Sequence, residues 1–185
     1  MAEKYGVDLL IHAFSLLRLN LQRANNEIYK LLKLRIVGGG PQENELKELV
    51  EKLNLESVTE FVGYIDHAKV PSELAKLDIY VALSRLDSES FGVAIVEAQA
   101  VGIPVVVSSV GGLPEVVKNN ITGLVVAKEN VLEASIALEK LVLSEELRLK
   151  MGKAGRAHVM KEYDWTKNTE KMIHVYSNLI KKSEK

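Results

Sequence analysis

The sequence lacks several features that would assign it to a class at once. It contains no cysteine, which excludes disulfides and thiolate metal sites and suits the reducing cytoplasm. No apolar run approaches the roughly 18 residues that a membrane-spanning helix needs, and the N-terminal residues do not form a signal-peptide pattern. The formal net charge is -1, so there is no electrostatic reason to expect nucleic acid or an anionic membrane as a partner. These absences predict a cytoplasmic protein.

Signatures of metal and dinucleotide sites are also missing. The four histidines are scattered and form no HExxH motif, so we expect no metal ion held by this chain alone. The triple glycine at 38–40 does not complete the dinucleotide fingerprint G-x-G-x-x-G, because Glu43 stands where the third glycine would be. This pattern disfavours an NAD-dependent oxidoreductase. It leaves Gly39 and its neighbours as a turn that is either purely structural or close to a ligand.

What is present is the composition of an ordinary globular domain. The chain of 185 residues is 47% apolar and 26% charged, and we expect a single domain over residues 1–185. Helical patterns alternate with short apolar runs, which predicts an α/β fold with a doubly wound parallel sheet. Strands are predicted at 32–38, 58–63, 78–84, 104–109 and 122–127. Helices are predicted at 7–19, 43–54, 68–76, 92–101 and 113–119, with a last helix over about 164–182. The residues expected to cap later helices are Asn130, Ser144 and Asp164.

Two glutamates stand out in the segment 84–115. Glu97 lies within GVAIVEAQAV, and its helical neighbours three and four residues away are apolar or small, which predicts a buried helix. A buried carboxylate is costly without hydrogen bonds. We therefore expect Glu97 either to be paired inside the fold or to face a cleft where a ligand supplies the donors. Glu89 lies in the polar loop LDSES, where a lone glutamate is usually solvated.

The start of the helix that carries Glu97 is a candidate anion site. The first N–H groups of a helix have no intrahelical partner, and they lie at the positive end of the helix dipole. The backbone of Phe91, Gly92 and Val93 is therefore expected to contact a phosphate group, because the glycine has no side chain to block it. The alternative is that Gly92 only makes a tight turn from strand to helix.

The whole segment resembles a known signature. Two glutamates with seven residues between them, FG before the second, and then EAQAVGIPVVVSSVGGLPE, closely resemble the signature of retaining GT-B glycosyltransferases of family 4, also called group 1. Nearly the whole chain follows the order of that family, from KYGVDLL through IVGGGPQENELKELVEKLNL and VTEFVGYI to the region of Tyr163. The resemblance implies the Rossmann-like C-terminal half of a GT-B enzyme, which binds a nucleotide-sugar.

The resemblance also implies roles for individual residues in binding the nucleotide. Glu97 matches the family glutamate that accepts hydrogen bonds from the ribose hydroxyls. The loop with Tyr64 and Ile65 matches the one whose backbone meets the base. Lys4 occupies the position of a lysine that contacts the diphosphate. Each residue also has an alternative interpretation. Glu97 could form a structural ion pair, the loop with Tyr64 could be an ordinary connection from strand to helix, and Lys4 could be a solvated surface charge.

For the sugar, Glu89 matches the family residue that orients the donor near the reaction centre, so it is the candidate catalytic residue. Ser90 stands where the family more often has glycine, a departure at the expected sugar contact. The expected donor is a UDP-, GDP- or ADP-sugar, and no further cofactor is implied. The retaining chemistry of the family depends on the donor phosphate and on groups across an interdomain cleft.

Two departures from the family pattern affect these expectations. Such enzymes are usually about twice as long, and the acceptor-binding N-terminal domain has no counterpart here. The strand that ends in Gly-Arg before the lysine is also absent, so we expect either a gap closed by neighbouring strands or an edge that pairs with another molecule. The partner arginine is lost with this strand. The chain alone is therefore expected to bind a donor but to transfer little.

A second hypothesis from a different class is a non-catalytic nucleotide-binding or interaction module. Two further expectations concern surfaces. The last helix carries apolar residues on one side that would lack part of their partner, which predicts self-association. They are Trp165, Met172, Ile173, Tyr176, Leu179 and Ile180. Through the full-length enzyme, the chain is expected to lie at a membrane only peripherally.

Overall fold

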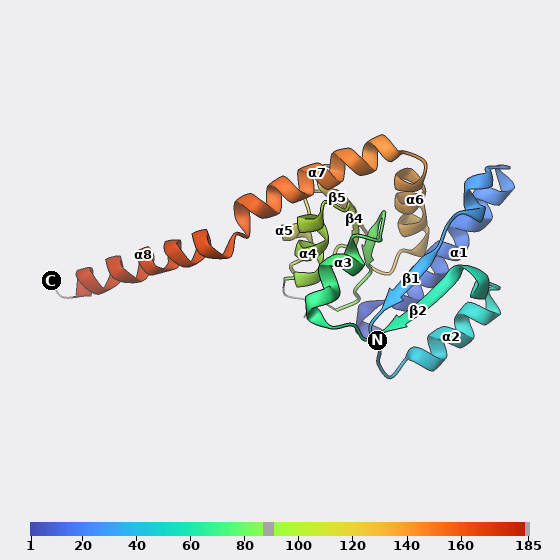
Figure 1. Cartoon of the computed structure of the whole chain (residues 1–185), viewed down its shortest axis with the longest axis horizontal. Coiled ribbons are helices and arrows are strands. Elements are labelled where there is room, and N and C mark those ends of the chain that lie inside the picture. The colour runs from blue at the N-terminus through green and yellow to red at the C-terminus, as the bar shows by residue number, and fades with distance from the viewer. Residues whose placement is uncertain (87–90, 184–185) are drawn as a thin grey trace.

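The computed structural model describes residues 1–86 and 91–183 and shows an α/β fold with parallel strands flanked by helices (Figure 1). The five strands lie close to their predicted positions, although each is shorter than its apolar run. They are β1 (Leu34–Val37), β2 (Thr59–Gly63), β3 (Tyr80–Ala82), β4 (Val105–Ser108) and β5 (Gly123–Val126). β4 is buried along its whole length, as expected of a central parallel strand.

The strands form two separate sheets. β1 pairs with β2 in one sheet, and the other has the order β3-β4-β5, with every ladder parallel. Among the residues that the structure describes, no ladder joins β1 to β3. Of the two alternatives expected for this part of the sheet, closure by neighbouring strands is therefore not seen in the described residues.

The helices cover the sheets in two groups that match two apolar cores. α1 (Val7–Arg23) packs against α2 (Glu43–Lys52) and α6 (Val131–Val142), and a core cluster joins these helices to strands of both sheets. A second cluster lies between the larger sheet and the segment from α3 to α5, and α7 packs on α4. The bounds are α3 (Val70–Leu74), α4 (Val93–Val101), α5 (Leu113–Val116) and α7 (Glu145–Glu162), with 3-10 turns at Glu3–Tyr5, Glu27–Lys30, Glu56–Val58 and His67–Lys69.

The predicted helix caps are confirmed. The Asn130 side chain accepts the amide of Glu133 at 3.0 Å, and Ser144 accepts the amide of Leu147 at 3.2 Å. Asp164 accepts the amide of Lys167 at 3.0 Å. Each bond satisfies an amide that has no partner within its own helix, which explains why α6, α7 and the last helix begin where they do.

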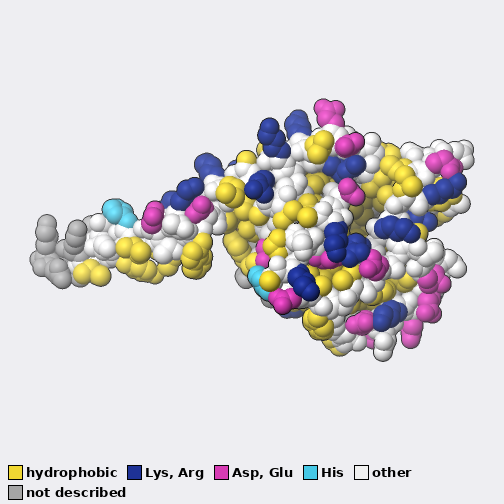
Figure 2. All heavy atoms as spheres, viewed as in Figure 1, with side chains coloured by type: hydrophobic (Ala, Val, Ile, Leu, Met, Phe, Trp, Pro, Cys, Tyr) yellow, Lys and Arg dark blue, Asp and Glu magenta, His cyan; other side chains and the backbone are white. Residues whose placement is uncertain are grey.

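The last helix, α8 (Trp165–Ser183), extends away from the body of the molecule (Figure 1). Its apolar side chains gather along one side and are exposed, as Figure 2 shows, so the expected apolar surface is confirmed. None of the helices within the described residues is both long and apolar enough to cross a membrane.

Candidate functional site

The candidate site lies at the carboxyl ends of the strands, where the two sheets meet. Segment 1–6 links the carboxyl end of β1 to the carboxyl end of β3. After β1, the carbonyl oxygen of Gly39 accepts a hydrogen bond from the Met1 amino group. After β3, the Arg85 amide donates to the carbonyl oxygen of Lys4 at 2.7 Å. The ends of β1 and β3 are therefore neighbours. In open α/β sheets, ligands bind outside the carboxyl ends of strands at such a change in strand order.

Gly92 is the N-cap of α4 and has a left-handed backbone with φ 71°. A Cβ atom added there would lie 2.7 Å from Leu113 Cδ2 and 2.9 Å from Ile95 Cδ1. The glycine is thus required by backbone conformation and by packing, which gives the tight-turn interpretation a physical basis. The amides of the first turn, including that of the exposed Val93, still lie at the positive end of the helix.

The prediction that α4 is buried on all sides is wrong. Val93 is 61% exposed and Ala94 is exposed too, whereas Ile95 and Ala98 are buried. The residues of this helix are apolar both where it is buried and in its exposed first turn, so the sequence alone does not show which part is exposed. As a result, Glu97 is half-buried, with 32% of its side chain exposed.

Glu97 faces the loop after β2. Its Oε1 atom lies 3.9 Å from Nε2 of His67, the first residue of a 3-10 turn that follows Ile65 closely. A contact of this length with an exposed imidazole leaves the carboxylate able to accept other hydrogen bonds. The structure thus brings Glu97 to the loop that contains Tyr64, which sequence spacing did not reveal, because a lone histidine gave no signal.

The loops after β1 and β2 are in direct contact. Gly38 donates its amide to the carbonyl oxygen of Gly63 at 2.8 Å, and both glycines have positive φ. The Tyr64 ring lies against Gly39, where an added Cβ would be 2.5 Å from Tyr64 Cε2. Tyr64 is 83% exposed and Ile65 is half-buried, so the flat Tyr64 ring is open to solvent beside the loop after β1.

The remaining residues expected at the site are Lys4, Glu89 and Ser90, and among the residues that the structure describes, Lys4 is not brought into contact with Glu97 or Tyr64. Lys4 is exposed, and its Nζ lies 4.8 Å from the centroid of the Tyr5 ring, so its ammonium group is turned to its own neighbour. Glu89 and Ser90, predicted to meet the sugar, lie outside the described residues.

Arg85 and Tyr163 lie beside segments of the site, and the sequence alone indicated a role for neither. Arg85 donates to Asp8 at 2.7 and 2.5 Å and to Glu129 at 3.1 Å, and its hydrogen bond lowers the pKa of Asp8. The rings of Phe91 and Tyr163 meet edge to face, with centroids 5.3 Å apart.

His158 packs on the other edge of Tyr163, with centroids 5.7 Å apart. Burial raises the pKa of Tyr163 and lowers that of His158, so the charged form of either ring is disfavoured. This aromatic stack therefore supports Phe91, the residue before Gly92, by packing and not by charge.

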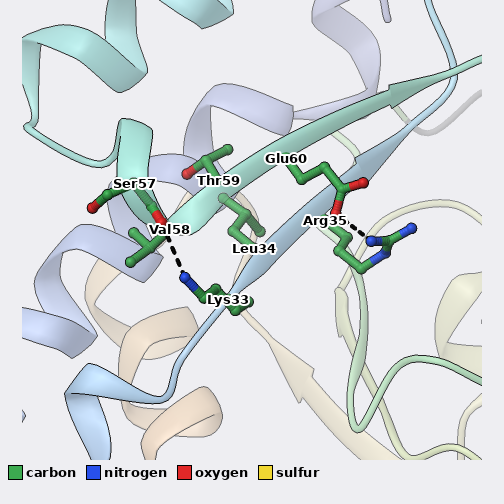
Figure 3. A pocket seen from close by; sticks show the side chains of 7 residues that line it. All are labelled: Lys33, Leu34, Arg35, Ser57, Val58, Thr59 and Glu60. Carbon is green, nitrogen blue, oxygen red and sulfur yellow. Dashed lines mark hydrogen bonds and ion pairs between the residues drawn. The ribbon is translucent and has the colours of Figure 1, made fainter.

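A hollow of about 410 Å³ lies elsewhere, at the amino ends of β1 and β2 (Figure 3). In the close-up, Lys33 reaches the carbonyl oxygen of Ser57, and Arg35 reaches Glu60. Because the hollow is at the opposite end of the strands from Tyr64, it does not belong to the candidate site. Within residues 1–86 and 91–183, no group of three or more acidic or histidine side chains is arranged to hold a metal ion.

Known proteins resemble the chain in sequence. A sequence model of the family described as "Glycosyl transferases group 1" matches residues 1–158. The chain is 35% identical over 148 residues to the GDP-mannose-dependent monoacylated alpha-(1-6)-phosphatidylinositol monomannoside mannosyltransferase of Corynebacterium glutamicum, covering 77% of the chain and 38% of that protein. It is 29% identical over 170 residues to the GDP-mannose-dependent alpha-(1-6)-phosphatidylinositol monomannoside mannosyltransferase of Mycobacterium tuberculosis, covering 89% and 42%. It thus spans less than half the length of these relatives.

The fold also matches about half of a solved chain. The structure of HepE from Anabaena in complex with UDP superimposes with a TM-score of 0.83 at 21% identity, covering 96% of this chain and 46% of that one. This likeness confirms the predicted Rossmann-like fold of a GT-B C-terminal half. Together with the family match over residues 1–158, it shows that the chain belongs to the group 1 family of glycosyl transferases.

Proposed function

We propose that residues 1–185 form a single donor-binding domain, which binds a nucleotide-sugar for a retaining, hexosyltransferase-like enzyme. The observation that carries this proposal is the position of Glu97, whose half-buried carboxylate faces the loop after β2 at the carboxyl ends of the strands. A carboxylate in this position can accept hydrogen bonds from two vicinal hydroxyls, as a ribose offers. Family membership and the likeness to a UDP complex support the same ligand class.

Each part of the donor has a candidate partner. The diphosphate would meet the backbone amides at Phe91, Gly92 and Val93, where the helix dipole favours negative charge. Lys4 would have to turn from the Tyr5 ring to add its charge. A contact between Lys4 and the diphosphate needs only a change of the lysine rotamer, because the side chain is exposed.

The base would lie against the loop of Tyr64 and Ile65, which packs on Gly39. The relatives named above use GDP-mannose, whereas the solved HepE complex holds UDP. We therefore leave the nucleoside to experiment and propose a nucleoside diphosphate sugar as the class. Glu89, beside Ser90, is proposed to orient the sugar ring as the catalytic residue.

Transfer is proposed to need a second, acceptor-binding domain, and the proposal is supported by the chain's spanning less than half the length of the named relatives. The chain alone is proposed to bind donor with little transfer, and the complete enzyme to meet membranes only peripherally. Transfer with retention would be checked by adding an acceptor domain and determining the anomeric configuration of the product by NMR.

Donor binding is tested by calorimetric titration with UDP, GDP, ADP and their sugar conjugates. One nucleotide should bind, and Glu97→Gln should weaken it about ten- to a hundredfold, the effect of losing hydrogen bonds to a charged group. Glu48→Gln, an exposed carboxylate on α2, is the matched control and should leave binding unchanged. No binding by any nucleotide to a chain shown to be folded would contradict the proposal.

A further inference from the structure

The position of His67 opposite Glu97 carries an inference that goes beyond the assignment of the carboxylate to the ribose. Glu97 Oε1 and His67 Nε2 are 3.9 Å apart, and the two side chains are 32% and 91% exposed. This separation is longer than the usual hydrogen-bond distance of about 2.7–3.2 Å, so the two groups face each other without a direct hydrogen bond. Because both side chains are open to solvent, a ligand can reach both.

The backbone of His67 is held by a closed turn. The Asp66 side chain accepts the amide of Ala68 at 3.0 Å, and the Asp66 carbonyl oxygen accepts the amide of Lys69 at 2.8 Å. An aspartate that binds the amide two residues on is a common way to fix a turn. The turn therefore fixes where the His67 side chain starts, while its exposed ring remains free to rotate.

Packing of α3 on α4 brings this turn opposite Glu97. α3 begins at Val70, directly after the turn, and the two helices are in contact. Leu74 of α3 lies in the same apolar cluster as Ile95 of α4, and Val70 packs against that cluster. The distance between His67 and Glu97 is therefore set by the apolar core below them and does not depend on an attraction between the two side chains.

The two groups are together complementary to a hydroxyl group. An ionised carboxylate only accepts hydrogen bonds, whereas an imidazole Nε2 that carries a hydrogen donates one. The negative charge of the carboxylate favours the ring form with hydrogen on the nitrogen that faces it. A hydroxyl both donates and accepts, so it can bind Glu97 Oε1 and His67 Nε2 at once. An ammonium group, which only donates, and a carbonyl oxygen, which only accepts, cannot do so.

The separation of the two atoms suits a single bridging oxygen. Two hydrogen bonds of about 2.8 Å that meet at a tetrahedral oxygen span about 4.6 Å. The observed 3.9 Å is shorter, so the His67 ring must withdraw by less than about 1 Å to admit the hydroxyl. A small change in the torsion angles of so exposed a side chain is enough for this movement.

We propose that His67 is a second ribose-binding residue, which holds one hydroxyl of the nucleotide between its Nε2 atom and the carboxylate of Glu97. This inference rests on the proposed donor site, because Glu97 is the other half of the pair. The bridging hydroxyl donates to Glu97 and accepts from His67, whereas the second ribose hydroxyl binds the carboxylate alone. The two hydroxyls therefore contribute unequally, and the site distinguishes a ribonucleotide from a deoxyribonucleotide through the bridging one.

The probes are UDP, GDP and ADP with the 2′-deoxy and 3′-deoxy analogue of each, titrated by calorimetry. For the base that binds, loss of the bridging hydroxyl should weaken binding at least about tenfold, because a hydrogen bond to a charged group is lost with it. His67→Leu should weaken the ribonucleotide about three- to tenfold, the effect of one neutral hydrogen bond. The same substitution should not change the affinity of the analogue that lacks the bridging hydroxyl.

Two further variants separate hydrogen bonding from a general effect of the substitution. His67→Gln keeps an N–H donor near the end of the side chain and should restore most of the affinity. His174→Gln, at an exposed histidine of α8, is the matched control and should leave binding unchanged. Because His67 is so exposed, its substitution should not disturb folding, which circular dichroism would check.

The results that would overturn the proposal differ from one another. Equal weakening of the ribonucleotide and both deoxy analogues by His67→Leu would show that the ring contacts the base or the phosphates. Unchanged binding would show that it contacts no part of the ligand, and tighter binding would show that it competes for Glu97. Absence of nucleotide binding to the wild-type chain would contradict the donor site itself, and this failure is seen before any substitution is made.

Discussion

Arg85 donates to both carboxylate oxygens of Asp8, at 2.7 and 2.5 Å, and so ties the end of β3 to the start of α1 across 77 positions of sequence. The guanidinium group is mostly buried, and its hydrogen bonds lower the pKa of the Asp8 carboxyl below 3.8. Since the loop to α4 follows Arg85, this pair fixes one end of the candidate site.

Asp8→Asn should therefore reduce stability in a pH-dependent way. The unfolded chain binds a proton at Asp8 at higher pH than the folded chain does, so the contribution is complete above 3.8 and is lost as the pH falls through the lower folded pKa. We expect a loss of about 1–2 kcal/mol in the free energy of unfolding at pH 7, which allows for solvent screening. Urea titrations at several pH values measure it, with the exposed Asp78→Asn as control. An equal loss at pH 7 and well below pH 3.8 would contradict this account.

Gln99 is fully buried between α4 and α7, and neither atom of its amide group has a hydrogen-bond partner. Gln99→Met keeps a similar shape and removes the buried polar atoms, so it should raise the free energy of unfolding by about 1–2 kcal/mol. Gln22→Met, at an exposed position of α1, is the matched control and should change stability little. Chemical denaturation would refute the interpretation if Gln99→Met were destabilising.

Gly92→Ala combines a strained left-handed backbone with a clash against Leu113, so it should cost about 2–4 kcal/mol of stability. Gly63→Ala is the informative comparison, because that glycine also has positive φ but open space around its Cβ position. It should cost only about 1–2 kcal/mol. Thermal unfolding of both variants separates the two contributions, and equal losses would show that packing against Leu113 is unimportant.

The exposed apolar side of α8 should make the chain associate with itself at high concentration. Replacing Ile173 and Tyr176 by glutamate should shift the mass measured by light scattering toward the monomer. Lys171→Glu adds a negative charge at another exposed position of α8 and should not. A strictly monomeric wild-type chain at high concentration would contradict the prediction.

Much of the fold follows from local patterns. Apolar runs located all five strands because buried parallel strands need apolar residues on both faces, and the caps followed from side chains such as Asn130 that bind nearby amides. β3 is shorter than its apolar run because Leu83 and Ser84, though buried, lie beyond the ladder with β4.

The contacts that shape the site could not be predicted in this way. Arg85 with Asp8, and Tyr163 with Phe91, join residues far apart in sequence, and no periodic pattern relates them. The neighbourhood of Glu97 was misjudged because an apolar helix is compatible with a buried or an exposed first turn. Family resemblance named Glu97, but only the folded chain shows that it meets His67.

The division of the strands into two sheets has a consequence for how the molecule opens. Among residues 1–86 and 91–183, no backbone ladder joins the unit from β1 through α2 to β2 to the larger sheet, and the two are connected by side chains of the apolar cluster around α1. Local opening costs only the contacts that are broken. We therefore expect this unit to open locally more readily than the three-stranded sheet, so that amides of β2 exchange with solvent faster than those of the fully buried β4.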